Sequence, residues 1–341
     1  MTSDRANPTL QDVAKAAGVS TATVSRCLNS PGVVVQDTRT RVMEAVERLG
    51  YTPNFGARAM AAKRTFTIGA IIPTMDNAIF ARGLQAFQEE LHTRGYTLLV
   101  SSSAYRQDVE DEQIRALVAR GADGLLLIGY ERAPSVYEYL ARRNVPVLIA
   151  WAYSAGKPQP AIGFDNRAAM RSLTREVLKC GHRSIGVISA MTKGNDRALE
   201  RVHGITEAVT EAGLDPADLD IIETPYEIEN GQAAFDTLMQ RGAKKTAIMC
   251  VNDVLAVGAL LRARERGLRV PEDISITGFD DIELARIVSP GLTTVHVPHR
   301  EMGRKAAIEL VQMVERKSVG VSLELQSSLQ MRGSLGPASK R

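Results

Sequence analysis

The sequence has little that would suit a secreted, membrane-bound or metal-dependent protein. Only three of its 341 residues are cysteines, and because they are odd in number and far apart, they predict neither a disulfide framework nor a zinc site. No apolar run approaches the ~18 residues of a membrane span. The chain begins MTSDRANP rather than with a hydrophobic signal segment. The five histidines show no metal-ligand spacing. We therefore expect a cytoplasmic protein with no metal and no cofactor.

Motifs of common enzyme classes are also missing. The chain contains no G-x-G-x-x-G, no G-x-x-x-x-G-K-[ST] and no G-x-S-x-G. Asp280 and Asp281 could be pictured as acid–base groups, but no candidate nucleophile or metal accompanies them. The sequence therefore predicts a protein that is not an enzyme.

The small net charge of +3 is unevenly placed. Residues 1–64 hold nine Lys or Arg and five Asp or Glu, whereas the remainder holds 33 against 34. All the positive excess thus belongs to the N-terminal segment. This distribution is typical of a DNA-binding head on a neutral body.

The stretch 9–29, TLQDVAKAAGVSTATVSRCLN, has the pattern of two short helices joined by a tight turn. Thr9 followed by Asp12 is typical of a helix start. Gly18 suits the turn, because a positive φ is easiest without a Cβ, and Ser20 can cap the second helix. The outward positions of that helix carry short hydrogen-bonding groups and one guanidinium, which suit a DNA major groove. They are Thr21, Ala22, Thr23, Ser25, Arg26 and Asn29. The alternative is an ordinary pair of amphipathic surface helices.

The rest of the N-terminal region predicts a third helix and a linker. Residues 37–49 place apolar side chains on one face, with Asp37 as the expected cap and Gly50 as the stop. We expect a helix-turn-helix domain over 8–53 and a linker over 54–64. The linker has no adequate apolar face, so it predicts either a helix that forms only in a complex or a flexible tether.

From residue 65 onward the sequence alternates strands and helices. Continuous apolar strands of four to six residues between helices indicate parallel sheets covered on both faces. About 260 residues of this pattern are more than a single hydrophobic core usually accommodates, so we expect two lobes. Lobe 1 is expected at 65–162 plus 292–320, and lobe 2 at 163–291 plus the C-terminal strands. Clefts in such sheets lie beyond the carboxyl ends of strands. Those positions here hold carboxylates, amides and one indole, which suit a small polar ligand.

Several motifs resemble the lactose-repressor/galactose-repressor family of bacterial transcription regulators, in the expected order. They are LQDVAKAAGVSTATVSR, YTPN, GFDN, GHRSIGVI, NDVLAVGA and ISITGFDD. GFDN and the general texture are similar to those of gluconate-type regulators. The resemblance implies a small all-α helix-turn-helix head and an α/β body. That body would have two periplasmic-binding-protein-like lobes, each a parallel sheet flanked by helices. It also implies a homodimer that represses transcription from operator DNA under the control of a small effector.

The resemblance also assigns roles to the DNA-binding residues. Thr21, Ala22 and Arg26 would face base edges, whereas Ser20, Thr23, Ser25 and Asn29 would mainly contact phosphates. Residues 54–62 match a hinge helix that forms on the operator, with Met60 where the family usually inserts a leucine into the minor groove. Tyr51, Asn54 and Arg58, from the same region, complete the expected DNA contacts.

For the effector, the resemblance points to a cleft between the lobes. The expected lining residues are Pro73, Asp76, Phe80, Trp151, Arg197, Arg201, Asn252 and Asp280. Trp151 stands where some relatives use an acidic residue, which argues against a simple neutral hexose. Two arginines in one pocket suit a carboxylate or phosphate, so a sugar acid is the preferred effector. Trp151 could equally be a packing residue, and Arg197 could equally be solvated.

The alternative function is a periplasmic-type sugar-binding receptor without a DNA role. Such a receptor shares the two-lobe body, but it is expected to have a signal peptide and no helix-turn-helix head. The end of the chain, GSLGPASKR, has no leucine heptads. We therefore expect a dimer rather than a tetramer.

Overall fold

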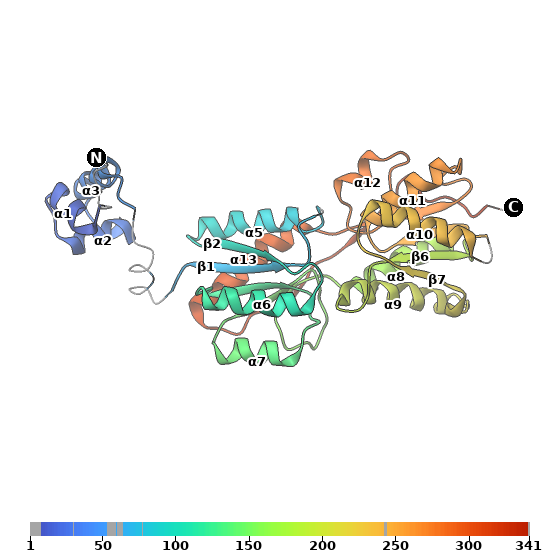
Figure 1. Cartoon of the computed structure of the whole chain (residues 1–341), viewed down its shortest axis with the longest axis horizontal. Helices are drawn as coiled ribbons and strands as arrows, with labels where there is room; N and C mark the ends of the chain where they lie inside the picture. Colours follow the sequence, from blue (N-terminus) through green and yellow to red (C-terminus); the bar gives the residue numbers. More distant parts are fainter. Residues whose placement is uncertain are drawn as a thin grey trace, which may run out of the picture. The chain divides into compact units, whose positions relative to one another are not determined.

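The computed structural model describes residues 8–29, 31–52, 59, 64–76, 78–241 and 244–339. Their contacts divide the chain into two compact units, one before and one after the junction between Thr65 and Phe66. Figure 1 shows both units. Among the described residues, no helix is long and apolar enough to cross a membrane.

The N-terminal unit is a three-helix head. Its helices are α1 (Leu10–Ala17), α2 (Thr21–Asn29) and α3 (Gln36–Leu49), with a short 3₁₀ turn, η1 (Pro31–Val33). Thr9 and Asp12 form the predicted capping box at the start of α1, and Gly18 ends α1 in the left-handed conformation at φ 66°. Eight buried side chains form the core of the head. The helix-turn-helix pattern is therefore confirmed.

The start of α3 differs from the prediction. Val35 is its N-cap residue and makes no side-chain capping bond. Asp37 lies inside the first turn, where it pairs with Arg41 at 3.6 Å on the surface. The expectation that Asp37 caps this helix is wrong, because the helix begins one residue before it.

The first lobe of the body is built on a parallel six-stranded sheet of order β11-β5-β4-β3-β1-β2. Its strands are β1 (Thr67–Ile72), β2 (Thr97–Ser102), β3 (Gly124–Ile128), β4 (Val147–Ala150), β5 (Ala161–Gly163) and β11 (Leu323–Glu324). Helices α6 (Gln107–Ala119) and α7 (Pro134–Arg142) share one core cluster with the sheet. The residues of α5 (Ala81–Thr93) and α13 (His299–Arg316) belong to another. Alternate residues of β3 join the two clusters, as expected of a strand buried on both faces.

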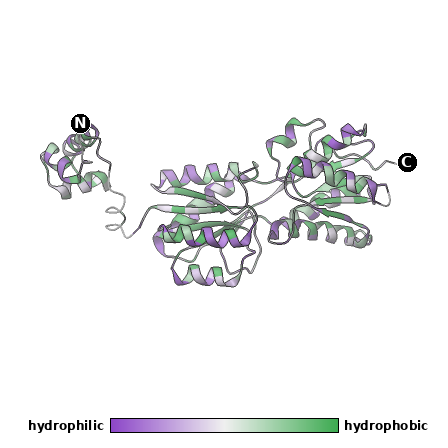
Figure 2. Cartoon of the chain, viewed as in Figure 1, coloured by the Kyte–Doolittle hydropathy of each residue, from purple (hydrophilic) through white to green (hydrophobic). Residues whose placement is uncertain are grey.

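The second lobe has a parallel four-stranded sheet of order β7-β6-β8-β9. Its strands are β6 (Ile185–Ser189), β7 (Asp220–Glu223), β8 (Ala247–Cys250) and β9 (Ser275–Thr277). Its helices are α8 (Asn166–Lys179), α9 (Asp196–Glu211), α10 (Ile228–Gln240), α11 (Asp253–Glu265) and α12 (Glu283–Ile287), with a 3₁₀ turn, η2 (Pro216–Asp218). Figure 2 shows the strands largely green and the helices mixed with purple. The predicted fold class is confirmed.

The lobe boundaries differ from the prediction near the C-terminus. Strand β10 (Thr294–His296) pairs with β12 (Ser328–Gln330), and bridges from Thr293 and His296 place this segment beside β9 of the second lobe. The chain re-enters the first lobe only with α13. Strand β11 belongs to the first sheet, so assigning all C-terminal strands to lobe 2 is wrong. Strands of two or three residues have too few positions to show a period.

Candidate DNA-binding surface and effector pocket

The outward face of α2 carries the groups predicted to contact DNA. Thr21, Ala22 and Arg26 are exposed, while Val24 and Cys27 are buried on the inner side of the helix. The Ser20 hydroxyl accepts a hydrogen bond from the Thr23 backbone N–H at 3.2 Å. Ser20 therefore caps α2 as predicted. This face presents small side chains and one guanidinium, which is compatible with close approach to base edges.

The other predicted DNA contacts are less directly described. Tyr51 is only 9% exposed and packs in the core of the head, so its position in the structure is that of a packing residue. Asn54, Arg58 and Met60 lie outside the described residues, as does the side chain of Asn29. Ser25 is partly buried on α2.

In the body, a narrow cavity lies between the two lobes. The first lobe contributes Ile79, Phe80, Tyr105 and Trp151, and the second contributes Asn195, Arg197, Arg201, Tyr226 and Asp280. Its volume is about 10 Å³, close to the space that one water molecule occupies. The lobes are therefore closed on one another in this structure. The pocket combines aromatic side chains with a few convergent polar groups, as small-molecule sites do.

Arg201, on α9, is held by acceptors from three separate segments. Its Nε donates to Asn166 Oδ1 at 2.8 Å, its Nη1 to the Val251 carbonyl at 2.7 Å, and its Nη2 to Asp280 Oδ1 at 3.2 Å. The guanidinium also lies 3.7 Å from the centre of the Phe279 ring. These contacts fix both the position and the plane of the guanidinium.

Asp280 supplies a buried carboxylate at the same place. Its side chain is 1% exposed, and its Oδ2 has no hydrogen-bond partner among the described residues. Burial raises the pKa of Asp280, and the nearby Arg201 opposes that shift. An unsatisfied buried oxygen facing a cavity is an acceptor for a ligand hydroxyl.

Arg197 also belongs to the pocket and is not solvated. It is 8% exposed, and its Nη1 donates to the Ile128 carbonyl at 3.1 Å and to Asp196 Oδ1 at 3.0 Å. The alternative that Arg197 is a solvated side chain is therefore wrong. Each pocket arginine is paired with a carboxylate of this chain, Arg201 with Asp280 and Arg197 with Asp196. The pocket consequently lacks the excess of positive charge that two unpaired arginines would give.

Trp151 packs in the lobe and lines the pocket at once. It is 1% exposed and meets Phe80 edge-on, with ring centroids 5.3 Å apart. Its indole Nε1–H donates to His299 Nδ1 at 3.2 Å, so the other ring nitrogen, Nε2, carries the proton and donates to the Asp280 carbonyl at 3.2 Å. Burial lowers the pKa of His299 to about 4. This chain of bonds joins the first lobe to Asp280.

The remaining predicted effector residues lie around this cavity rather than in it. Asn252 is fully buried and caps α11, with its Oδ1 accepting from the Leu255 backbone N–H at 2.9 Å. Pro73 lines a small adjoining cavity that also contains Arg197. Asp76 is exposed and accepts a bond from the Thr74 hydroxyl at 3.1 Å.

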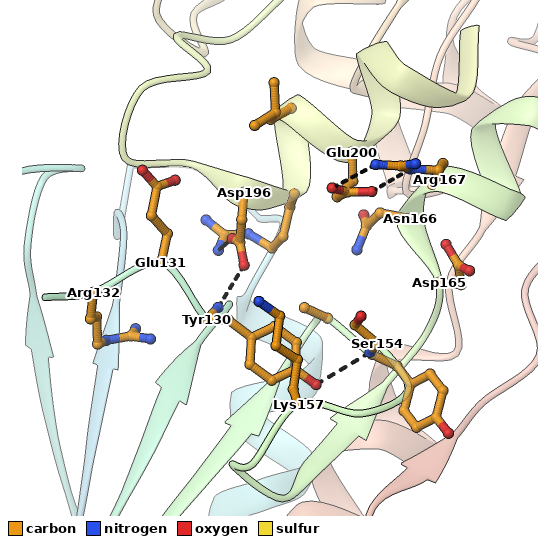
Figure 3. Close-up of a pocket in the computed structure, with 14 residues that line it drawn as sticks. Tyr130, Glu131, Arg132, Ser154, Lys157, Asp165, Asn166, Arg167, Asp196 and Glu200 are labelled. Atoms are coloured by element: carbon orange, nitrogen blue, oxygen red, sulfur yellow. Dashed lines mark hydrogen bonds and ion pairs between the residues drawn. The ribbon is translucent and has the colours of Figure 1, made fainter. Parts of the chain in front are cut away.

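A larger chamber of about 760 Å³ lies on the other side of Arg197. Figure 3 shows Tyr130 and Lys157 of the first lobe facing Asp196, Asn166 and Glu200 of the second. Most of its polar groups are already bonded. Tyr130 N–H donates to Asp196, the Tyr130 hydroxyl accepts from the Ser154 N–H, and Arg167 pairs with Glu200. The chamber is thus a gap between the two lobes in which most polar groups already have partners within the protein.

Comparisons with known proteins bear on both units. Residues 9–54 match the model of bacterial regulatory proteins of the lacI family, and residues 174–335 match a periplasmic binding protein-like domain. The chain is 32% identical over 317 residues to catabolite control protein A of Priestia megaterium, covering 93% of this chain and 96% of that protein. The chain belongs to the lacI family.

Two further relatives place this lacI-family member among regulators. It is 33% identical over 312 residues to the transcriptional repressor PurR of Aliivibrio salmonicida, covering 91% of this chain and 93% of that one. A crystal structure of the Lac repressor dimer bound to operator and the anti-inducer ONPF superimposes with a TM-score of 0.85 at 27% identity, covering 97% and 100%. The relatives are transcription regulators rather than enzymes, and nothing supports the alternative of a sugar receptor. This lacI-family chain is a DNA-binding transcription regulator.

Sequence reasoning missed several residues of the pocket in this lacI-family regulator. Tyr105 and Tyr226 meet across the lobes with ring centroids 5.6 Å apart. Asn166 connects Arg201 to the Trp151 carbonyl, which accepts from its Nδ2 at 3.0 Å. The GFDN motif ends in Asn166, so its position was visible in the sequence. No local signal marked the two tyrosines or His299.

Proposed function

We propose that this regulator is a repressor that binds operator DNA as a homodimer in the cytoplasm. Its affinity for the operator is controlled by a polyhydroxylated effector, a sugar or sugar acid, bound between the lobes. The Lac repressor dimer on its operator and its similarity over nearly the whole chain support the assembly. The exposed face of α2 supports DNA readout through Thr21, Ala22 and Arg26. No catalytic step is part of this function.

One observation carries the effector class: the half-satisfied carboxylate of Asp280. Its Oδ1 is taken by Arg201, while Oδ2 lies buried without a partner among the described residues. While Asp280 is ionised through its pairing with Arg201, a ligand hydroxyl can donate to that oxygen, whereas an ionised ligand carboxylate or phosphate has no proton to donate. Hydroxyl groups therefore supply the primary contact.

A carboxylate on the effector has a second place to bind. Arg197 uses only Nη1 for its bonds to Ile128 and Asp196, and a guanidinium has five N–H donors. The charge on Arg197 is already matched by Asp196. An acidic group thus strengthens binding at Arg197 but is not required there.

Thermal unfolding against matched ligands tests the effector class. The panel pairs neutral sugars with their aldonic acids, such as glucose with gluconate, and adds sugar phosphates and purines. A binder raises the unfolding midpoint, because a ligand at 100 times its Kd stabilises the native state by about 2.7 kcal/mol. We expect shifts from sugars or sugar acids, and loss of the shift in Asp280→Asn. Shifts from purines alone, or a shift that survives Asp280→Asn, would contradict the hydroxyl contact.

A further inference from the structure

The two lobes are joined by a tight contact between the end of β3 and the start of α9. Tyr130 N–H donates to Asp196 Oδ2 at 2.6 Å, and Arg197 Nη1 donates to the Ile128 carbonyl at 3.1 Å. One residue further along, Gly194 N–H donates to Glu131 Oε1 at 3.2 Å. Backbone groups of one lobe are therefore matched to charged side chains of the other.

Gly129 lies at the centre of this contact and leaves no room for a side chain. Its φ is +72°, and a Cβ built on it would lie 2.2 Å from both Arg197 Nη1 and Asp196 Oδ1. Real Cβ atoms do not approach other heavy atoms so closely, so the contact forms only because residue 129 is glycine. Any larger residue must displace the ends of the Asp196 and Arg197 side chains, which make the bonds across the lobes.

The position of the contact connects it to both cavities. Arg197 lines the narrow pocket on one side and the 760 Å³ chamber on the other. Asp196 lines the chamber, where Figure 3 shows it directed at Tyr130. The contact therefore separates the narrow pocket from the larger chamber.

We propose that Gly129, Asp196 and Arg197 form a latch that holds the lobes closed over the narrow pocket, and that this latch must open before an effector can enter. When the latch opens, Arg197 leaves Ile128 and the pocket gains access to solvent. Because Arg197 also faces the effector, binding of the effector and closure of the lobes share one side chain. The link between lobe closure and the effector rests on the proposed function, whereas the contact between the lobes does not.

The chain contains a natural reporter for this latch, because Trp151 is its only tryptophan. The indole is 1% exposed and lines the pocket between the lobes. Opening the lobes admits water and small quenchers to one side of the ring. Emission wavelength and acrylamide quenching of the full-length protein therefore measure closure without any effector. A negative result in this test would not affect the proposed effector class, and a negative result in the thermal unfolding panel would not affect the latch.

The decisive variant is Gly129→Ala, with Gly95→Ala as its matched control. Gly95 lies in the same lobe at φ +75°, and a Cβ there meets nothing within 4 Å. Both substitutions place alanine in the same left-handed region, but only Gly129→Ala meets Asp196 and Arg197. We expect a red shift of Trp151 emission and a higher quenching constant for Gly129→Ala, and values of the parent for Gly95→Ala.

A second variant keeps the latch testable if Gly129→Ala does not fold. Asp196→Ala removes the acceptor of the Tyr130 N–H and leaves the Gly129 backbone unchanged. We expect a smaller change in the same direction, with far-UV circular dichroism like that of the parent. If the folded variants protect Trp151 as well as the parent does, the latch is not what closes the lobes, and the proposal is overturned.

Discussion

The head and the body of this regulator place their functional groups in opposite environments. On the head, Thr21, Ala22 and Arg26 are exposed on one face of a single helix. In the body, Arg201 and Asp280 are buried, come from distant segments and bond to each other. Groups that read a large, charged partner such as DNA must stay accessible, whereas groups that hold a small ligand gain strength from exclusion of water. A substitution in the buried site is therefore expected to lower the stability of the body, whereas a substitution on the exposed face of α2 is expected to change DNA binding alone.

The largest expected effect is that of Arg201→Ala on the stability of the body. Loss of the guanidinium leaves Asp280, Asn166 and the Val251 carbonyl without their shared donor. Removing one partner of a buried ion pair costs about 3–5 kcal/mol, although protonation of Asp280 relieves part of this. Calorimetry of the full-length protein should show the body unfolding at a lower temperature and the head unchanged.

Arg201→Lys is the matched control for that substitution. It keeps the positive charge but cannot reproduce the three-way fork of bonds. We expect its stability to lie between those of the parent and Arg201→Ala. If the parent, Arg201→Lys and Arg201→Ala were equally stable, the bonds of the buried guanidinium would not stabilise the body, and this prediction would be wrong.

His299 makes the body, but not the head, sensitive to mild acid. Its pKa falls from 6.5 to about 4 because the ring is buried. The folded protein therefore keeps the ring neutral while the unfolded chain takes up a proton below pH 6.5. The stability that this difference supplies is full above pH 6.5 and is lost as the pH falls towards 4, by about 2 kcal/mol between pH 7 and pH 5.

Unfolding of the parent and of His299→Gln at several pH values tests this dependence. Glutamine can donate to the Asp280 carbonyl and accept from Trp151, but it does not titrate. We expect a flatter stability curve for the variant between pH 7 and pH 5. Curves with the same slope would show that other groups, such as His182, dominate this range.

The contrast between the head and the body also explains which features could be predicted from the sequence. In the head, the capping box at Thr9, the turn at Gly18 and the burial of Val24 depend on neighbours within one or two helical turns. Local sequence motifs therefore predicted the cap at Thr9 and the turn at Gly18 correctly. The missed cap at Asp37 shows the ordinary uncertainty of helix ends.

In the body, the sequence predicted the strand–helix order and several pocket positions but not their partners. Arg201 and Asp280 are 79 residues apart, and Trp151 reaches His299 across 148. Their pairing depends on how helices and strand ends pack within each lobe, which no local pattern contains. Asn252 is an example: it was expected to line the pocket, but its side chain caps α11.

On the head, Arg26→Ala should weaken DNA binding without disturbing the body. Arg26 is exposed on α2, and loss of an arginine contact to a base costs about 1–3 kcal/mol of affinity. The measurement is fluorescence anisotropy at fixed salt, on a site selected from random DNA. Arg48→Ala on α3, exposed as well, controls for the loss of one positive charge. A loss of affinity equal to that of Arg48→Ala would reduce Arg26 to a general electrostatic role.

The smallest effect is expected where a contact joins the lobes but is exposed. Arg82 on α5 pairs with Glu283 on α12 at 2.6 Å, with side chains 36% and 78% exposed. Exposed ion pairs contribute about 0–1 kcal/mol, so Arg82→Ala should change neither the unfolding midpoint nor the quenching of Trp151 measurably. Asp196, which bonds a backbone N–H across the lobes from a less exposed position, should have the larger effect. If Arg82→Ala exposed Trp151 as much as Asp196→Ala, burial would not decide which contacts hold the lobes together.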